Sequence, residues 1–570
     1  MALPGWNKLL GLVRRREVTL EVSDSLLPTA NSSTPVPSEP NSSDESTPFL
    51  PKRPSRSKLT KAHQTSDAEV RGRTPFTSYD STVTLINSPS SSSLLSSSSS
   101  LYEESEPASW AEYRTEAKIL SRLTLPVVFT YLLQSSINMA SVFSLGHLGA
   151  NELAASALAS MFASVTGWAV GIGLVTALDT LCSQSYTGAR DVYAVGTYLQ
   201  RGIVVITACH IPILLIWWNS EALLLALNQD PVIASLAGTY LRYLMLGCLP
   251  NLLFECVKRY LQAQGIMHAS TLVLCIVAPL NMLTNYALVW YEPIALGFVG
   301  APLATSITYW LMFILLVLYT AYVDGYQAWG GWSRQGFRKL GQFLRLGLPG
   351  VLMICAEWWA FEYVSLTVSY FGNTSLAAQS VIMTTTSLTF QIPQGIGVVI
   401  TTRVGNLLGA ARARAARMSS ALAIVFALAL GLTNSLFFLT AAGWWGRVFT
   451  SAPEVVEMVA SLMKVAALFQ VCDGLATVTG GILRGQGKQK LGAMLNIPAY
   501  YVLAIPAGLF LGFRMEYGVY GIWAGLCIGI FSVCFGQFYF YLRTDWEEEV
   551  AKCRKRVGAD DHEYLSTTHV

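Results

Sequence analysis

Charged residues are scarce in this sequence. They make up 13% of its 570 residues, whereas soluble domains carry about 25%. Hydrophobic residues make up 52%, and the mean hydropathy is +0.43. The net charge of +3 is too small to indicate a nucleic-acid partner. These values exclude an ordinary soluble domain and predict a polytopic membrane protein that has the lipid bilayer as its surroundings.

Signatures of enzymes and metalloproteins are also missing. The sequence has no HExxH, GxSxG or DDxxD motif. Its ten cysteines are scattered, without a CxxC pair or a Cys/His cluster. We therefore expect no enzymatic activity, no metal site and no organic cofactor. The opening MALPGWNKLLGLVRRR is not a secretory signal, because its apolar core is short and the arginines follow it.

Residues 1–110 differ in composition from the rest of the chain. Ser, Thr and Pro dominate from Ser23 to Ser88, and an almost pure Ser run extends from Ser90 to Ser100. Such a segment has too little apolar surface to offset the entropy lost on ordering, so we predict a disordered cytosolic tail. Residues 546–570 are predicted to form a second, charged cytosolic tail.

Twelve apolar segments lie between the tails, and each can cross about 30 Å of hydrocarbon as a helix. They are predicted at 122–145, 153–178, 198–218, 232–256, 269–291, 298–322, 343–370, 376–402, 416–441, 454–480, 491–512 and 517–542. We expect an all-α polytopic membrane protein with two six-helix lobes, residues 111–325 and 326–545.

The turns between these segments differ in basic residues. The even-numbered turns contain Arg190, Lys258, Arg259, Arg334, Arg338, Lys339, Arg412, Arg414, Arg417, Arg484, Lys488 and Lys490. The odd-numbered turns contain only Arg447 and Arg514. Basic residues accumulate on the cytosolic side of membranes, so this bias predicts that both termini are cytosolic.

The two halves of the chain resemble each other at an offset of about 223 residues. RLTLPV at Arg122–Val127 matches RLGLPG at Arg345–Gly350, and YLQAQG at Tyr260–Gly265 matches ILRGQG at Ile482–Gly487. Because six helices return to the same side, the repeats are parallel. Two such bundles enclose a central cavity, the architecture of secondary transporters that work by alternating access.

Two glutamates interrupt the seventh segment, LGLPGVLMICAEWWAFEYVSLTVSYF (Leu346–Phe371). A charge at bilayer depth costs roughly 2.5–3.5 kcal/mol on insertion scales, so an acid there indicates a functional site. Surroundings of low dielectric constant favour the neutral carboxyl, which suits reversible protonation of Glu357. Glu362 lies about 140° further around the helix. We expect one of the two to face the cavity and the other to make a structural hydrogen bond or ion pair.

The repeat relates these acids to amides. Glu357 corresponds to Gln134 in the first segment, and Asp473 in the tenth corresponds to Asn251 in the fourth. Ion coupling is therefore expected in the second half, at Glu357, Asp473 and Glu362. Candidates for the cavity wall are Gln134, Asn251, Trp358 and Trp359, of which the indoles can stack on an organic cation.

Asp179 and Arg403 lie near the cytosolic ends of the second and eighth segments. These segments are equivalent in the two repeats. A carboxylate and a guanidinium at related ends favour a closing ion-pair network or helix capping over a role in transport chemistry. Pro349 and Pro393 lie inside helical segments, where they remove a backbone donor and allow bending.

Several segments carry a family resemblance over roughly residues 112–545. They are GHLGANELAASALA, ALDTLCSQSYTGA, YLQAQG, PGVLMICAEWWAFE, IPQGIGVVITTRVGNLLGA and GGILRGQGKQKLGA. The chain resembles the eukaryotic branch of the multidrug and toxic compound extrusion (MATE) family. It is most similar to fungal members related to the yeast ethionine-resistance transporter.

This resemblance implies twelve helices in two lobes and the antiport of organic cations, drugs or metabolites against protons. It also implies that Glu357, Glu362 and Asp473 form the coupling site. Many bacterial members carry an Asp in the first helix, where this chain has SSINMASVFSLGHLG, with Ser141 near that position. A proton site in the first lobe is therefore not expected.

Alternatives to proton-coupled export remain at this point. Sodium could replace the proton, or the substrate could be a lipid-linked oligosaccharide moved by a flippase of the same superfamily. A flippase would need basic residues along its cavity, and the apolar segments contain mainly Arg242 and Lys464. We expect a monomer, in the vacuolar or the plasma membrane.

Overall fold

The computed structural model describes residues 109–558, which are helical throughout and contain no strand in that range. Of the tail predicted to be disordered, residues 1–110, all but Ser109 and Trp110 lie outside the described residues, as does the end of the C-terminal tail, residues 559–570. Ser109 and Trp110 are ordered at the start of the first helix. The first helix, α3 (Trp110–Gly146), begins at a capping box. Ser109 Oγ accepts from Glu112 N, and Glu112 Oε2 accepts from Ser109 N.

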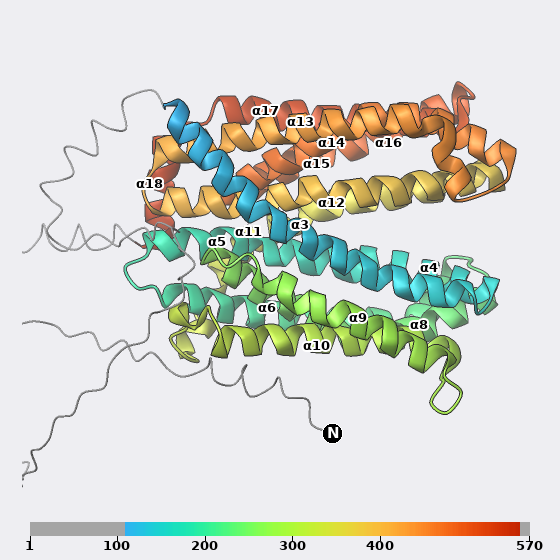
Figure 1. Ribbon diagram of the computed structural model, residues 1–570, viewed down its shortest axis with the longest axis horizontal. Helices are drawn as coiled ribbons and strands as arrows, with labels where there is room; N and C mark the ends of the chain where they lie inside the picture. The colour runs from blue at the N-terminus through green and yellow to red at the C-terminus, as the bar shows by residue number, and fades with distance from the viewer. Residues whose placement is uncertain (1–108, 559–570) are drawn as a thin grey trace, which may run out of the picture. The chain divides into compact units, whose positions relative to one another are not determined.

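The first six spans form one lobe, whose buried core is continuous. After α3 it contains α4 (Ala150–Ala163), the π-helical turn η2 (Ser164–Trp168), α5 (Ala169–Gly188), α6 (Ala194–Trp218), α7 (Ser220–Ala226), α8 (Pro231–Ala263), α9 (Ala269–Trp290), η3 (Gly297–Val299) and α10 (Gly300–Tyr322). The elements α4, η2 and α5 run on as one membrane span. Figure 1 shows this lobe in blue to green.

The second lobe is built in the same order. After the short 3₁₀ turns η4 (Tyr326–Ala328) and η5 (Arg334–Phe337), it contains α11 (Leu340–Val368), η6 (Ser369–Phe371), α12 (Asn373–Gly409), α13 (Ala413–Trp445), η7 (Gly446–Val448), α14 (Pro453–Gln486), α15 (Gln489–Ile497), η8 (Pro498–Ala504), α16 (Ile505–Leu509), η9 (Phe510–Arg514) and α17 (Gly518–Leu542). Here α15 to η9 form one span.

All twelve predicted spans are helices. Eleven of the described helices are long and apolar enough to cross a membrane. The remaining span, α12, falls below that apolarity because it is rich in Thr and Ser. Its threonines point largely inward: Thr385 and Thr401 are each 1% exposed, and their hydroxyls donate to carbonyls of the preceding turn.

Two helices cross between the lobes. Near its start, α3 contacts α12 and α13, and further along it contacts α4, α9 and α10. In Figure 1 it runs obliquely from one lobe to the other. Its repeat partner α11 likewise packs against α5 and α6 of the first lobe and against α12, α15 and α17 of the second. Residues of α3 and α11 therefore lie at the boundary between the lobes.

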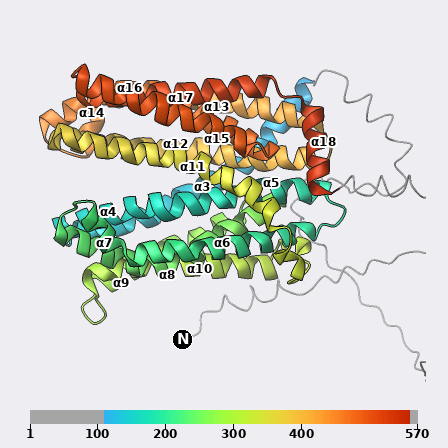
Figure 2. The same cartoon turned by 180° about the vertical axis from the view of Figure 1, so that it is seen from behind.

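The predicted charged tail contains an ordered helix, α18 (Trp546–Val557), capped by Asp545. It lies across the ends of the other helices, as Figure 2 shows. It contacts α5 of the first lobe and α12 and α13 of the second. We call this end of the two lobes the α18 end. The sequence pattern missed the helix because only Trp546, Glu549 and Cys553 face inward.

Candidate substrate and ion site

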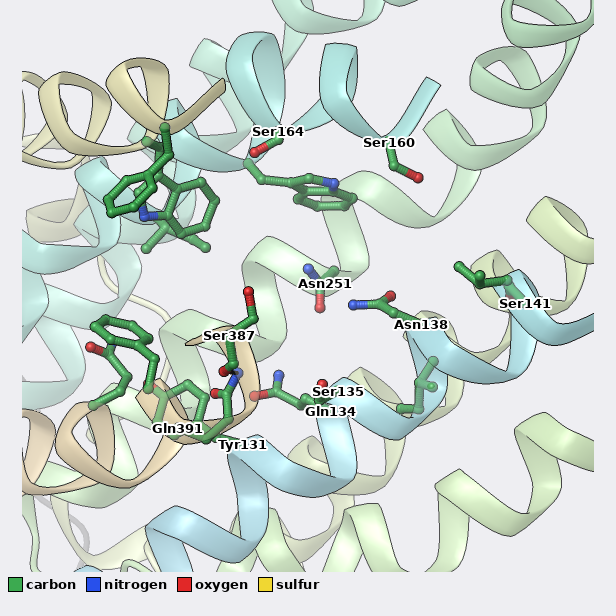
Figure 3. A pocket seen from close by; sticks show the side chains of 18 of the residues that line it. Tyr131, Gln134, Ser135, Asn138, Ser141, Ser160, Ser164, Asn251, Ser387 and Gln391 are labelled. Carbon is green, nitrogen blue, oxygen red and sulfur yellow. Dashed lines mark hydrogen bonds between the residues drawn. The ribbon is translucent and has the colours of Figure 1, made fainter. Parts of the chain in front are cut away.

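A cavity of about 670 Å³ lies between the lobes. Helices α3, α4, α5, α8 and α10 line it from the first lobe, and α11, α12 and α14 line it from the second. Figure 3 shows amide and hydroxyl side chains directed into it, among them Asn138, Ser160, Asn251, Ser387 and Gln391. The aromatic side chains on its wall are Tyr131, Trp168, Tyr240, Tyr309, Trp358, Phe361, Phe390 and Phe469.

Helix α11 brings both of its glutamates to this cavity. Glu357, Trp358, Phe361 and Glu362 all line it. They occupy positions i, i+1, i+4 and i+5 of the helix, which form one broad face. The expectation that only one glutamate faces the cavity is therefore wrong. Because α11 lies at the boundary between the lobes, a wider face of this helix borders the cavity than would be the case for a helix inside a lobe.

Trp359 is also expected at the cavity wall from the sequence, but it is not among the lining residues. It lies on another face of α11, its side chain is 43% exposed, and its indole N–H donates to Val165 O of η2 at 3.0 Å. Neighbouring residues on a helix are separated by about 100°, which is why Trp358 and Trp359 point in different directions.

Asp473 of α14 reaches the same cavity and is 5% exposed. Within residues 109–558, neither Asp473, Glu357 nor Glu362 forms an ion pair with a basic side chain. Glu362 interacts with the hydroxyl of Ser164 in η2, which also lines the cavity. The structure thus brings the three acids that the sequence singled out to one cavity, and none of the three forms an ion pair there.

The repeat-related amides also line the cavity. Asn251 points into it, as does Gln134 (Figure 3). Gln134 Nε2 donates to Glu255 Oε1 of α8 at 3.1 Å. The amide that replaces Glu357 in the first repeat therefore connects the cavity to a charged cluster in the first lobe.

This cluster was missed by the sequence analysis. The sequence places Lys258 and Arg259 in a turn, but both lie inside α8, at 1% and 6% exposure. Lys258 Nζ lies 2.5 Å from Glu255 Oε1, and Arg259 Nε lies 2.8 Å from Asp179 Oδ1 on α5. Arg259 Nη2 also lies 3.6 Å from Glu255 Oε2. Two carboxylates and two cations thus neutralise each other inside the first lobe.

A second basic residue assigned to a turn, Arg484, is also buried. It lies in the last turns of α14 and is 8% exposed. Arg484 lines a small cavity of about 80 Å³, together with Asp179 and Arg259 of the first lobe and Glu357 and Asp473 of the second. This small cavity connects the acids of the main cavity to the charged cluster. In the sequence, Arg484 is recognisable only as a basic residue directly after an apolar segment. The same pattern marks the end of a helix.

At the α18 end, the lobes are in direct contact. Thr187 Oγ1 of α5 donates to Asn406 O of α12 at 2.6 Å. Arg403 and Asp179, expected to form a closing ion-pair network or to cap helices, do not pair with each other. Asp179 pairs with Arg259, and Arg403 pairs with Glu116 of α3. The main cavity is therefore closed at this end.

Glycines allow this close approach. A Cβ on Gly350 would lie 2.5 Å from Gly173 O, and one on Gly173 would overlap Val351 Cα. Helix α18 adds contacts to both lobes. Arg556 Nη1 donates to Gln184 Oε1 at 2.5 Å, and Lys488 Nζ lies 3.1 Å from Glu549 Oε1. Burial lowers the pKa of Arg556 and raises the pKa of the Cys553 thiol to about 12.

Two parallel bundles around a polar cavity define a membrane transporter, and comparison with known proteins agrees. The MatE family model matches residues 126–287 and 349–510, once in each lobe. An uncharacterized transporter of Schizosaccharomyces pombe is 42% identical, over 78% of this chain and 83% of its own. Multidrug and toxin extrusion protein 2 of Mus musculus is 36% identical, over 80% of this chain and 79% of its own.

Among solved structures, that of the eukaryotic MATE transporter AtDTX14 is similar, with a TM-score of 0.74 and 29% sequence identity. The alignment covers 78% of this chain and 100% of that one. The chain therefore belongs to the MatE family, the multidrug and toxin extrusion transporters.

Proposed function

We propose that the protein is a secondary antiporter that exports organic cations, drugs or metabolites in exchange for protons. The observation that carries this proposal is the charge of the main cavity. Its lining contains four carboxylates, Glu255, Glu357, Glu362 and Asp473, and one basic side chain, Arg259. A cavity with an excess of acids and with aromatic walls favours a positively charged, partly apolar substrate.

Proton coupling is supported by the surroundings of Glu357 and Asp473. Both carboxyl groups lie at the meeting of the two cavities, without a basic partner in an ion pair. Burial away from water favours the protonated form of a carboxyl group, so such a pair can take up and release protons during a transport cycle. Protonation removes the charge that attracts the cation, and the two ligands therefore exclude each other.

Sodium coupling is the closest alternative. The two carboxylates could supply ligands for Na⁺, with amide and hydroxyl oxygens completing the shell. A lipid-linked-substrate flippase is a weaker alternative, because it would need cations to hold a pyrophosphate group. Arg242 and Lys464, the basic residues that the sequence placed inside the spans, do not line the cavity.

We propose that the α18 end faces the cytosol. The basic residues Arg412, Arg414, Lys488 and Lys490 lie beside it, which agrees with the distribution of basic residues in membrane proteins. Both termini are then cytosolic, and the cavity is closed towards the cytosol. We further propose that the protein works as a monomer in the vacuolar or the plasma membrane.

The test uses the purified full chain in proteoliposomes and a fluorescent organic cation. Uptake is measured under a proton gradient, under a sodium gradient at equal pH, and under neither. The proposal predicts uptake under the proton gradient alone. Uptake that follows sodium at equal pH would establish the alternative ion. Absence of uptake under both gradients, with uptake of a lipid-linked pyrophosphate probe, would replace the antiporter by a flippase.

A further inference from the structure

We infer that Arg484 is a positioning residue that couples proton release from Glu357 to opening of the cytosolic end. Asp179 of the first lobe and Glu357 of the second compete for its guanidinium only while that end is closed. This inference rests on the proposed proton coupling at Glu357. Arg484 adds a fixed cation to the site of Glu357 and Asp473.

The backbone of Arg484 is held against the first lobe. Thr180 Oγ1 of α5 donates to Arg484 O at 2.5 Å, and Gln184 Nε2 donates to Gly485 O at 2.8 Å. Gln489, at the start of α15, donates from Nε2 to Thr180 Oγ1 at 2.7 Å. These hydrogen bonds join α5 to the second lobe at the point where the side chain of Arg484 begins.

The side chain extends into the small cavity between the lobes, where it is nearly inaccessible to solvent. Among residues 109–558, no other side chain forms a hydrogen bond or an ion pair with its guanidinium. Asp179, by contrast, already has Arg259 Nε at 2.8 Å. The guanidinium is therefore a buried cation whose charge is shared among several neighbours.

Charged and titratable neighbours surround it from each packed element. They are Tyr131 on α3, Asp179 on α5, Arg259 on α8, Glu357 on α11, Asp473 on α14 and Tyr500 on η8. Glu255 and Lys258 are further charges around Asp179. Only Asp179, Glu357 and Asp473 are carboxylates on the small cavity, and only Asp179 belongs to the first lobe.

Separation of the lobes changes this balance. When the cytosolic end opens, Asp179 moves away with α5, whereas Arg484 and Glu357 stay together in the second lobe. The attraction between charges falls with distance, so the guanidinium then interacts with Glu357 and no longer with Asp179. That interaction favours the carboxylate form of Glu357, and the proton leaves on the cytosolic side. When the end closes, Asp179 returns, the guanidinium is shared again, and Glu357 can bind a proton from the opposite side.

The repeat assigns this role to one lobe. Arg484 corresponds to Gln262, whose side chain is uncharged and accepts from Arg259 Nη1 at 3.1 Å. The first lobe therefore has a neutral residue at the position of the shared cation. This agrees with amides at the positions of both coupling acids in that lobe.

The direct test is the protonation of Glu357, followed by pH-dependent infrared difference spectra of the purified full chain. The carboxyl band is assigned by its loss in Glu357→Gln. Arg484→Gln should raise the midpoint pH by about one unit or more, because the neighbouring cation is lost. Asp179→Asn should lower it, because Arg484 is no longer shared. Arg242→Gln, which removes a cation paired with Glu221 at 2.8 Å away from both cavities, should leave it unchanged.

Dependence on closure is tested with Thr187→Cys/Asn406→Cys, a pair across the closed end. Cross-linking should raise the midpoint of Glu357 relative to the reduced protein, and Asp179→Asn should abolish this difference. An equal difference with and without Asp179, or an unchanged midpoint in Arg484→Gln, would overturn the inference. If Arg484→Gln does not elute as a single species, Arg484→Lys replaces it. Lysine keeps the positive charge on a shorter side chain, so the midpoint pH of Glu357 should lie between those of the wild type and a variant without the charge.

Two outcomes separate this inference from the proposed function. If the Glu357 band does not titrate in the wild type, proton coupling at Glu357 is wrong, and the role of Arg484 is wrong with it. If Glu357 titrates normally but ignores Arg484 and Asp179, only the inference is overturned. In proteoliposomes, Arg484→Gln should lose accumulation of tetraethylammonium driven by the proton gradient, whereas Arg242→Gln should keep it.

Discussion

Arg403 and Glu116 form a two-fold hydrogen-bonded ion pair between the lobes, with Nε–Oε1 and Nη2–Oε2 distances of 2.8 Å. The arginine lies on α12, the glutamate lies on α3, and Ser419 Oγ of α13 donates to the same carboxylate at 2.5 Å. This geometry satisfies both oxygens of a glutamate that is 5% exposed. The pair joins the start of α3 to α12, and Ser419 extends the contact to α13.

Loss of one partner of this pair should destabilise the folded protein. Arg403→Gln leaves the Glu116 carboxylate buried without its cation, which costs roughly 3–5 kcal/mol for a fully buried pair. We expect a cost towards the lower end, because the Arg403 side chain is 22% exposed. Thermal unfolding of the purified protein measures the change. The matched control is Arg414→Gln, since Arg414 pairs with Glu112, one turn earlier on α3.

The Glu112 side chain is 47% exposed. Exposed ion pairs contribute about 0–1 kcal/mol, so the control should unfold close to the wild type. Equal destabilisation by both substitutions would contradict the account of Arg403 as the main ion pair at this end.

A larger residue at Gly350 should prevent the lobes from closing. Its Cβ would overlap Thr176 Oγ1 and lie 2.5 Å from Gly173 O, so α5 and α11 would have to separate. We expect Gly350→Val to abolish cross-linking of Thr187→Cys/Asn406→Cys. Gly341→Val is the control on the same helix, because a Cβ there meets no atom within 4 Å. Undiminished cross-linking in Gly350→Val would show that this contact is not needed for closure.

Docking of α18 should protect Cys553 from thiol reagents. The side chain is 0% exposed, and burial raises its pKa to about 12 from 9.0. The docked thiol thus keeps a proton that the released thiol loses, and docking should weaken as the pH rises from 9.0 through about 12. Arg556→Ala removes the hydrogen bond to Gln184 and should speed up labelling by a membrane-impermeant maleimide at neutral pH.

Cys553→Ser identifies the labelled site, since the extra signal should disappear in that background. Labelling of the wild type at the rate of Arg556→Ala would mean that α18 does not hold the two lobes together.

The helices were predictable because hydropathy and the repeat are properties of long segments. The three acids were predictable because a carboxyl group inside an apolar run is rare. The charged cluster was not. Hydropathy falls at Lys258, Arg259 and Arg484, so these residues resemble helix ends, whereas α8 and α14 continue through them. Which charges face each other depends on how α5 packs against both lobes, and no local pattern encodes that packing. The same reason explains why Arg403, expected near Asp179, pairs with Glu116.

Coupling at Glu357 is tested most directly by comparing Glu357→Gln with the wild type in proteoliposomes, in two assays on the same preparation. One is exchange of labelled tetraethylammonium at equal pH, and the other is its accumulation under a proton gradient. Proton coupling at Glu357 predicts that Glu357→Gln loses accumulation, because a permanently neutral side chain cannot carry a proton. Its exchange should be weakened but present, because Glu362 and Asp473 still attract the cation. Accumulation at the wild-type level in Glu357→Gln would contradict the assignment of Glu357 as the coupling residue.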